Sequence, residues 1–151
     1  MNIEIFEMAI TEGIASGLIA ELDAELRQRY PGQPIHGVDA GEFQAAGGYF
    51  VVARASAEYA GCGAFRPVNA STVEIKRMFV RRTFRRRGTA RIILQALEAE
   101  AKRRGYTRSI LETAIRLPEA LSLYRAAGYS DIDPFGSYVG SERSVCLGKE
   151  L

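Results

Sequence analysis

One stretch of this chain concentrates residues whose type and spacing can do chemistry. Between Ile75 and Leu97 the sequence has no acid but eight cations, which are Lys76, Arg77, Arg81, Arg82, Arg85, Arg86, Arg87 and Arg91. Most of them precede Gly88, where an amphipathic pattern predicts the start of a helix. Unpaired N–H groups at a helix N-terminus attract anions, phosphate above all, and a glycine lets a ligand approach the backbone closely. The stretch therefore predicts a phosphate- or pyrophosphate-binding loop.

Two other interpretations of these arginines stay open. They can form a solvated basic loop without a ligand, or they can bind nucleic acid or an acidic partner, since arginine clusters also contact phosphodiesters. Against nucleic acid, only Phe79 and Phe84 stand among these cations, which is not the regular interleaving with aromatic residues that base-stacking platforms would show. The Gly-x4-Gly-Lys-Ser/Thr and Gly-x-Gly-x-x-Gly nucleotide motifs are also missing. We expect neither a nucleic-acid nor a membrane partner.

Hydrophobic periodicity predicts the elements that must position this loop. Helical spacing predicts helices over 13–29, 88–103 and 118–127, and β-rich runs predict a short first strand near Ile3 and strands over 49–55, 59–65, 72–80, 108–114 and 144–149. Residues 31–48 are the longest irregular segment, and such segments are often functional. The order β-α-β-β-β-α-β-α-β predicts a mixed sheet with helices on its faces, an α/β (or α+β) fold in a single domain over residues 1–151.

Composition narrows the class of protein. With 151 residues, 47% apolar and 25% charged, the chain is typical of one globular domain and unlike a disordered or fibrous protein. No apolar run approaches the ~18 residues of a membrane span, and the start lacks the pattern of a secretory signal. Cys62 and Cys146 lie far apart, with no histidine or further cysteine near either in sequence. We therefore expect a reduced, cytoplasmic protein with no metal site.

The loop also carries a family resemblance. Arg85-Arg86-Arg87-Gly88-Thr89-Ala90 resembles the (Gln/Arg)-x-x-Gly-x-(Gly/Ala) signature of the GNAT family of N-acetyltransferases. Residues 74–80 look like that family's fourth strand, and residues 110–113 and 123–129 look like its next two elements, so the resemblance covers roughly residues 49–129. It implies an acyl-CoA N-acyltransferase fold and an enzyme that uses acetyl-CoA as cosubstrate to acetylate an amine by direct attack.

The resemblance also implies how acetyl-CoA would bind. In the family the fourth strand splays away from the fifth, and pantetheine lies in the gap like an extra strand. By position, backbone groups of Met78, Phe79 and Val80 would hold pantetheine and the thioester carbonyl. The pyrophosphate would lie on the loop formed by Arg85, Arg86, Arg87, Gly88, Thr89, Ala90 and Arg91.

Tyr124 occupies the position of the family's tyrosine, whose phenol can protonate the CoA sulfur. The alternative is a tyrosine packed in the core with its hydroxyl merely hydrogen-bonded. One departure is Leu117, where many members carry an asparagine that contacts CoA, so we expect that contact to be missing or replaced.

The general base has several candidates. Glu74 occupies the position of the base carboxylate in one branch of the family, and its alternative role is an ion pair within the sheet. Strand alternation predicts that Glu74 shares a face with Lys76 and Met78 and that Arg77 points away from the amine. Other candidates are His36, since an imidazole can act as a base near neutral pH, a water molecule, and Glu112, which could instead be a solvent-side residue.

The segment around Phe135 and Tyr138 resembles the acceptor-pocket rim of small bacterial members. Together with Glu74 and His36 these residues predict a pocket with aromatic walls and one carboxylate, which suits a compact small-molecule amine better than a flat protein surface. The alternative is that the two loop aromatics form an interface or a lid over the core. Cys146 is interpreted as a buried strand residue rather than a nucleophile. The acceptor, the range of acyl groups and the oligomeric state, including a homodimer, stay open. So does a non-catalytic acyl-CoA-binding domain.

Overall fold

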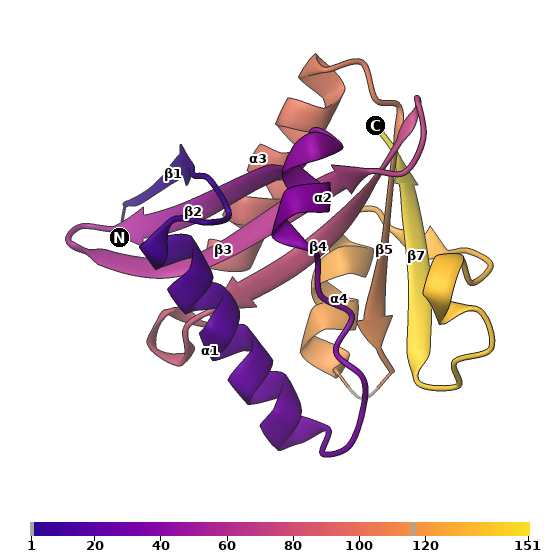
Figure 1. Ribbon diagram of the computed structural model, residues 1–151, viewed down its shortest axis with the longest axis horizontal. Coiled ribbons are helices and arrows are strands. Elements are labelled where there is room, and N and C mark those ends of the chain that lie inside the picture. Colours follow the sequence, from indigo (N-terminus) through magenta and orange to yellow (C-terminus); the bar gives the residue numbers. More distant parts are fainter. Residues whose placement is uncertain (1, 116) are drawn as a thin grey trace.

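The computed structural model describes residues 2–115 and 117–151, whose strands form one mixed sheet in the order β1-β2-β3-β4-β5-β7-β6 (Figure 1). The strands are β1 (Ile3–Glu7), β2 (Tyr49–Ala55), β3 (Glu58–Pro67), β4 (Thr72–Val80), β5 (Arg108–Ala114), β6 (Ser130–Asp131) and β7 (Ser144–Glu150). The helices are α1 (Gly13–Arg29), α2 (Ala40–Ala45), α3 (Thr89–Arg103) and α4 (Pro118–Ala126), with single 3-10 turns η1 (Arg82–Phe84) and η2 (Gly136–Tyr138). The expected mixed sheet and its order of elements are confirmed, with α2 and β6 as additions.

Helices cover both faces of the sheet. In Figure 1, α1 and α2 lie in front of the sheet, and α3 and α4 lie behind it. The front core is built around Leu18 and Phe43, and the rear core around Leu97 and Leu111. Gly63 of β3 allows close packing at the rear, because a Cβ there would lie 2.6 Å from the side chain of Ile93 on α3. No described helix is long and apolar enough to cross a membrane.

The sheet opens between its two central strands. Strands β4 and β5 run parallel and pair only from Thr72 with Arg108 to Ile75 with Leu111. Beyond that pair, the described part of β4 makes no further pairing with β5, whereas β5 continues alongside β7 as far as Ala114. The expected separation of the fourth and fifth strands is therefore present, and residues 76–80 of β4 keep a free edge.

A bulge in β4 corrects the expected side-chain alternation. Arg77 has a φ of +57°, and Gly63 of β3 lies opposite both Arg77 and Met78 because the register shifts there. Met78 consequently packs against the rear core, away from Glu74, while Arg77 pairs with Asp23 of α1 on the front face. The predictions that Met78 shares the face of Glu74 and that Arg77 points away from the acceptor side are wrong, because strict alternation fails at a bulge.

Helix α2 lies inside the segment that was expected to be irregular. The Asp39 side chain caps it by accepting a 2.8 Å hydrogen bond from the Glu42 amide, and Phe43 is buried against Gly48. The Asp-x-x-Glu spacing of Asp39 and Glu42 is a helix-start signal that could have predicted this turn.

Candidate active site

The arginine-rich loop ends at an open helix N-terminus. Arg86 and Gly88 have φ angles of +63° and +78°, and no side chain caps α3. The Ile92 amide donates to the Gly88 carbonyl. The amides of the first turn that precede Ile92 therefore have no hydrogen-bond acceptor within the helix. A Cβ added at Gly88 would meet nothing within 4 Å, and the Thr89 hydroxyl turns inward to donate to the Phe84 carbonyl. The loop therefore presents backbone amides and open space, as an anion site requires.

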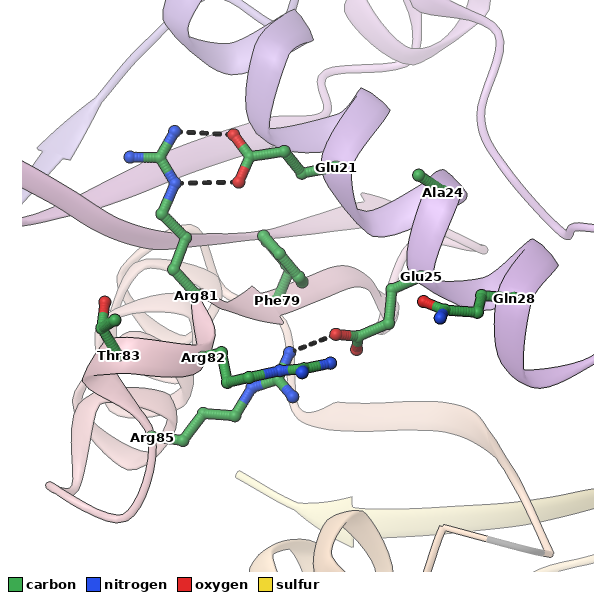
Figure 2. Close-up of a pocket in the computed structure, with 9 residues that line it drawn as sticks. All are labelled: Glu21, Ala24, Glu25, Gln28, Phe79, Arg81, Arg82, Thr83 and Arg85. Carbon is green, nitrogen blue, oxygen red and sulfur yellow. Dashed lines mark hydrogen bonds and ion pairs between the residues drawn. The ribbon is translucent and has the colours of Figure 1, made fainter.

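Two of the arginines turn towards α1 instead. Figure 2 shows a cavity of about 430 Å³ between α1 and η1, in which Arg81 forms a double hydrogen bond with Glu21. The Arg85 guanidinium donates to Glu25 at 2.6 Å and to the Val80 carbonyl at 2.8 Å. Ion pairs with α1 thus occupy these two side chains, and the Val80 carbonyl at the free edge of β4 is already hydrogen-bonded.

Tyr124 lies in the rear core, on α4. It is 7% exposed, and its ring packs edge-on against Tyr129, with centroids 5.9 Å apart. No described residue forms a hydrogen bond with the Tyr124 hydroxyl. The alternative interpretation, a core tyrosine with a hydrogen-bonded hydroxyl, therefore agrees with the packing of the ring but not with the expected hydrogen bond. Burial and then the negative charge of Glu112 raise the pKa of Tyr124 well above its ordinary value. The phenol therefore keeps its proton at neutral pH. Leu117, at the start of α4, has no polar side chain that could replace the family's asparagine contact.

Glu74 is enclosed on the front face of the sheet. It is 1% exposed, accepts two hydrogen bonds from Arg66 at 3.0 and 2.8 Å, and accepts one from the Tyr138 hydroxyl at 2.9 Å. Burial and the Glu74 charge raise the pKa of Tyr138. The expected alternative, an ion pair within the sheet, is thus what the structure contains. Sequence reasoning missed Arg66, although the short turn between β3 and β4 sets Arg66 opposite Glu74.

Lys76 follows Glu74 on the same face. Its ammonium lies 4.0 Å from the Glu74 carboxylate and donates to the Gly37 carbonyl at 3.2 Å. Burial lowers the pKa of Lys76, an effect that Glu74 partly opposes.

The three predicted acceptor-pocket residues come together around one ring. Tyr138 packs edge-on against His36 and Phe135, with centroids 5.0 and 5.2 Å away. His36 comes from the segment between α1 and α2, which also contacts the loop before β7 through Gln33 and Arg143. Two loops distant in sequence therefore meet over the front face beside the separated strands.

Glu112 and Cys146 are neighbours across β5 and β7. Glu112 is half-buried and accepts a 2.6 Å hydrogen bond from the Ser144 hydroxyl. Cys146 is a buried free thiol whose pKa is raised by burial, which agrees with its interpretation as a strand residue.

Comparisons with known proteins agree on one family. The model of the acetyltransferase (GNAT) family matches residues 18–129. The IAA acetyltransferase of Azospirillum brasilense is 33% identical in an alignment of 151 positions that covers 99% of each chain. A crystal structure from Klebsiella pneumoniae, assigned as an acyl-CoA N-acyltransferase, superposes with a TM-score of 0.83 at 28% identity and covers 99% of this chain and 97% of that one. A GNAT acetyltransferase of Elizabethkingia anophelis with acetyl-CoA bound gives a TM-score of 0.74 at 21% identity, with 99% of both chains covered.

Proposed function

The chain belongs to the GNAT acetyltransferase family, and on that basis we propose that it transfers the acetyl group of acetyl-CoA to a primary amine of a small molecule by direct attack. The observation that carries the proposal is the separation of β4 from β5 beside the open N-terminus of α3. A strand edge and a helix N-terminus at one gap suit a ligand with an amide-bearing arm and a pyrophosphate.

The donor occupies that gap in the proposal. Pantetheine lies along the free edge of β4 at Met78, Phe79 and Val80, and the pyrophosphate lies on the amides of residues 85–91, with Gly88 at the point of closest approach. The open space in front of Gly88 supports this placement, and the relative from Elizabethkingia is described with acetyl-CoA bound. Arg81 and Arg85 are engaged by Glu21 and Glu25, which leaves less free positive charge for a nucleic-acid partner.

The chemistry follows from the groups beside the gap. The amine nitrogen attacks the thioester carbonyl carbon, the C–S bond breaks, and Tyr124 gives its proton to the CoA sulfur. The Tyr124 side chain is largely buried, and its hydroxyl has no hydrogen-bond partner among the described residues, which supports this role. Glu74 accepts a hydrogen bond from the Tyr138 hydroxyl and so fixes the position of this ring on the acceptor side. The aromatic walls from His36, Phe135 and Tyr138 favour a compact amine over a protein surface.

Release of free CoA thiol from acetyl-CoA tests the proposal, in a panel of amino acids and polyamines with a lysine peptide beside them. We expect turnover with at least one small amine and slower turnover with the peptide. Acetyl-CoA, unlike duplex DNA, should also raise the melting temperature. Binding of acetyl-CoA without thiol release from any amine would instead identify a non-catalytic acyl-CoA-binding domain.

A further inference from the structure

We infer that Glu112, rather than Glu74, receives the ammonium group of the acceptor and takes its proton before the attack. The inference rests on the proposed acetyl transfer and adds the residue that selects and activates the amine.

The position of Glu112 in the sheet is the first support. It is the first residue of β5 beyond Leu111, where pairing with β4 ends, and Lys76 holds the corresponding place on β4. Glu112 thus lies at the point where the two strands separate, beside the gap proposed for the thioester. Leu111 packs in the rear core, so strand alternation directs Glu112 to the front face, where Glu74 and Lys76 lie.

Charge pairing is the second support. On this face Arg66 pairs with Glu74, and Arg77 pairs with Asp23. Glu112, in contrast, has the Ser144 hydroxyl as its hydrogen-bond donor and no ion pair with any residue in 2–115 or 117–151. A half-buried carboxylate with one hydrogen-bond donor and no ion pair still has oxygen lone pairs that can bind a cation. An ammonium group supplies both the positive charge and the hydrogen-bond donors. Glu74 offers no such place, because Arg66 and Tyr138 already enclose it.

The third support is the reach of Glu112 towards the reacting atoms. Burial raises the pKa of both Tyr124 on α4 and Tyr138 on η2, and the negative charge of Glu112 adds to each rise, so Glu112 lies within electrostatic range of both phenols. Its charge also acts on Lys76 of β4 and Cys146 of β7. The amine nitrogen is therefore assigned to Glu112 and the CoA sulfur to Tyr124.

The proton balance is complete with these two residues. The ammonium gives one proton to the Glu112 carboxylate, and the neutral nitrogen forms the C–N bond to the thioester carbon. As the C–S bond breaks, Tyr124 gives its proton to sulfur, and the second amine proton returns to the Tyr124 oxygen. The products are the amide, CoA thiol and one proton, which leaves Glu112 for solvent.

Glu112→Gln tests the assignment with two probes. One is the alkylamine that the wild type acetylates fastest, which is charged at neutral pH, and the other is hydroxylamine, which is uncharged there. We expect Glu112→Gln to lower kcat/KM for the alkylamine by about 100- to 10,000-fold, the range of a general base, and to leave hydroxylamine turnover close to the wild-type value. The exposed Glu58 provides the control, and Glu58→Gln should change neither rate.

Two further outcomes are decisive. Equal losses for both amines, with the wild type active, overturn the assignment of Glu112 and leave the acetyl transfer standing. A wild type that releases no thiol with either amine overturns the proposed function itself.

A second pair of variants applies if Glu112→Gln does not fold. Glu112→Asp keeps the carboxylate and should retain a higher alkylamine-to-hydroxylamine rate ratio than Glu112→Ala. Equal ratios in these two variants count against the assignment.

Discussion

Arg77 and Asp23 form a 2.6 Å ion pair that ties the bulge of β4 to α1. The Arg77 side chain is 4% exposed and that of Asp23 is 24% exposed, so the pair is largely shielded from water. It holds α1 over the strand whose free edge faces the proposed thioester, and it thereby links the stability of the fold to the geometry of the site.

Removing one partner of this pair should destabilise the protein. Asp23→Asn leaves a buried guanidinium without its counter-charge, and we expect a loss somewhat below the roughly 3–5 kcal/mol of a fully buried pair. Glu21→Gln is the matched control, because it breaks the exposed pair of Arg81 with α1 and should cost about 1 kcal/mol or less. Urea unfolding measures both variants, and equal losses would contradict the structural role of the Arg77 pair.

The bulge also marks the limit of sequence-based prediction. The strand over 72–80, the helix after Gly88 and the loop between them follow from local periodicity and were predicted with small boundary errors. The bulge at Arg77 lies instead opposite Gly63 of β3, which packs closely against α3. These contacts join segments distant in sequence, and the alternation of residues along one strand carries no information about them. The same holds for His36 and Tyr138, since tertiary packing decides how the loops that carry them meet.

Gly88 and Gly105 offer a matched pair for testing the phosphate site. Both have positive φ angles, +78° and +93°, at opposite ends of α3, and a Cβ at either would meet nothing within 4 Å. Replacing either by alanine should cost about 1–2 kcal/mol of stability through backbone strain. Calorimetric titration should show weaker acetyl-CoA binding for Gly88→Ala, unchanged binding for Gly105→Ala and no binding for Gly88→Glu. Unchanged affinity in Gly88→Glu would place the pyrophosphate elsewhere.

Tyr124→Phe should separate chemistry from binding. We expect kcat to fall by about 100-fold, within the usual contribution of a general acid, while acetyl-CoA affinity stays close to that of the wild type. Because the pKa of Tyr124 is raised by burial, the rate in the wild type should not fall through loss of this proton as the pH rises from neutral towards the ordinary pKa of tyrosine. Single-turnover kinetics provide the check, and an unchanged chemical step in Tyr124→Phe would remove the acid role.

Glu100 should make stability depend on acid pH. Hydrogen bonds from Arg103, opposed in part by burial and reinforced by Arg104, lower the pKa of Glu100 from 4.5 to about 2. As the pH falls from 4.5 towards 2, the Glu100 carboxyl takes up a proton more readily in the unfolded chain than in the folded one. The contribution of Glu100 to stability is therefore present above pH 4.5 and is lost as the pH falls towards 2. Thermal unfolding should show Glu100→Gln less stable than the wild type at neutral pH and nearly equal to it near the lower value. A difference that does not change with pH would exclude this origin.

Following an isotopically labelled acetyl group distinguishes direct transfer to a small amine from hydrolysis and from acetylation of the protein. Labelled acetyl-CoA is incubated with the enzyme and the small amine that gives the fastest thiol release, and mass spectrometry follows the label. We expect one labelled amide for each CoA thiol released, with no label on the protein, and slower formation of the amide in Tyr124→Phe. Label recovered as free acetate or on the protein chain, without labelled amide, would contradict direct transfer to a small amine.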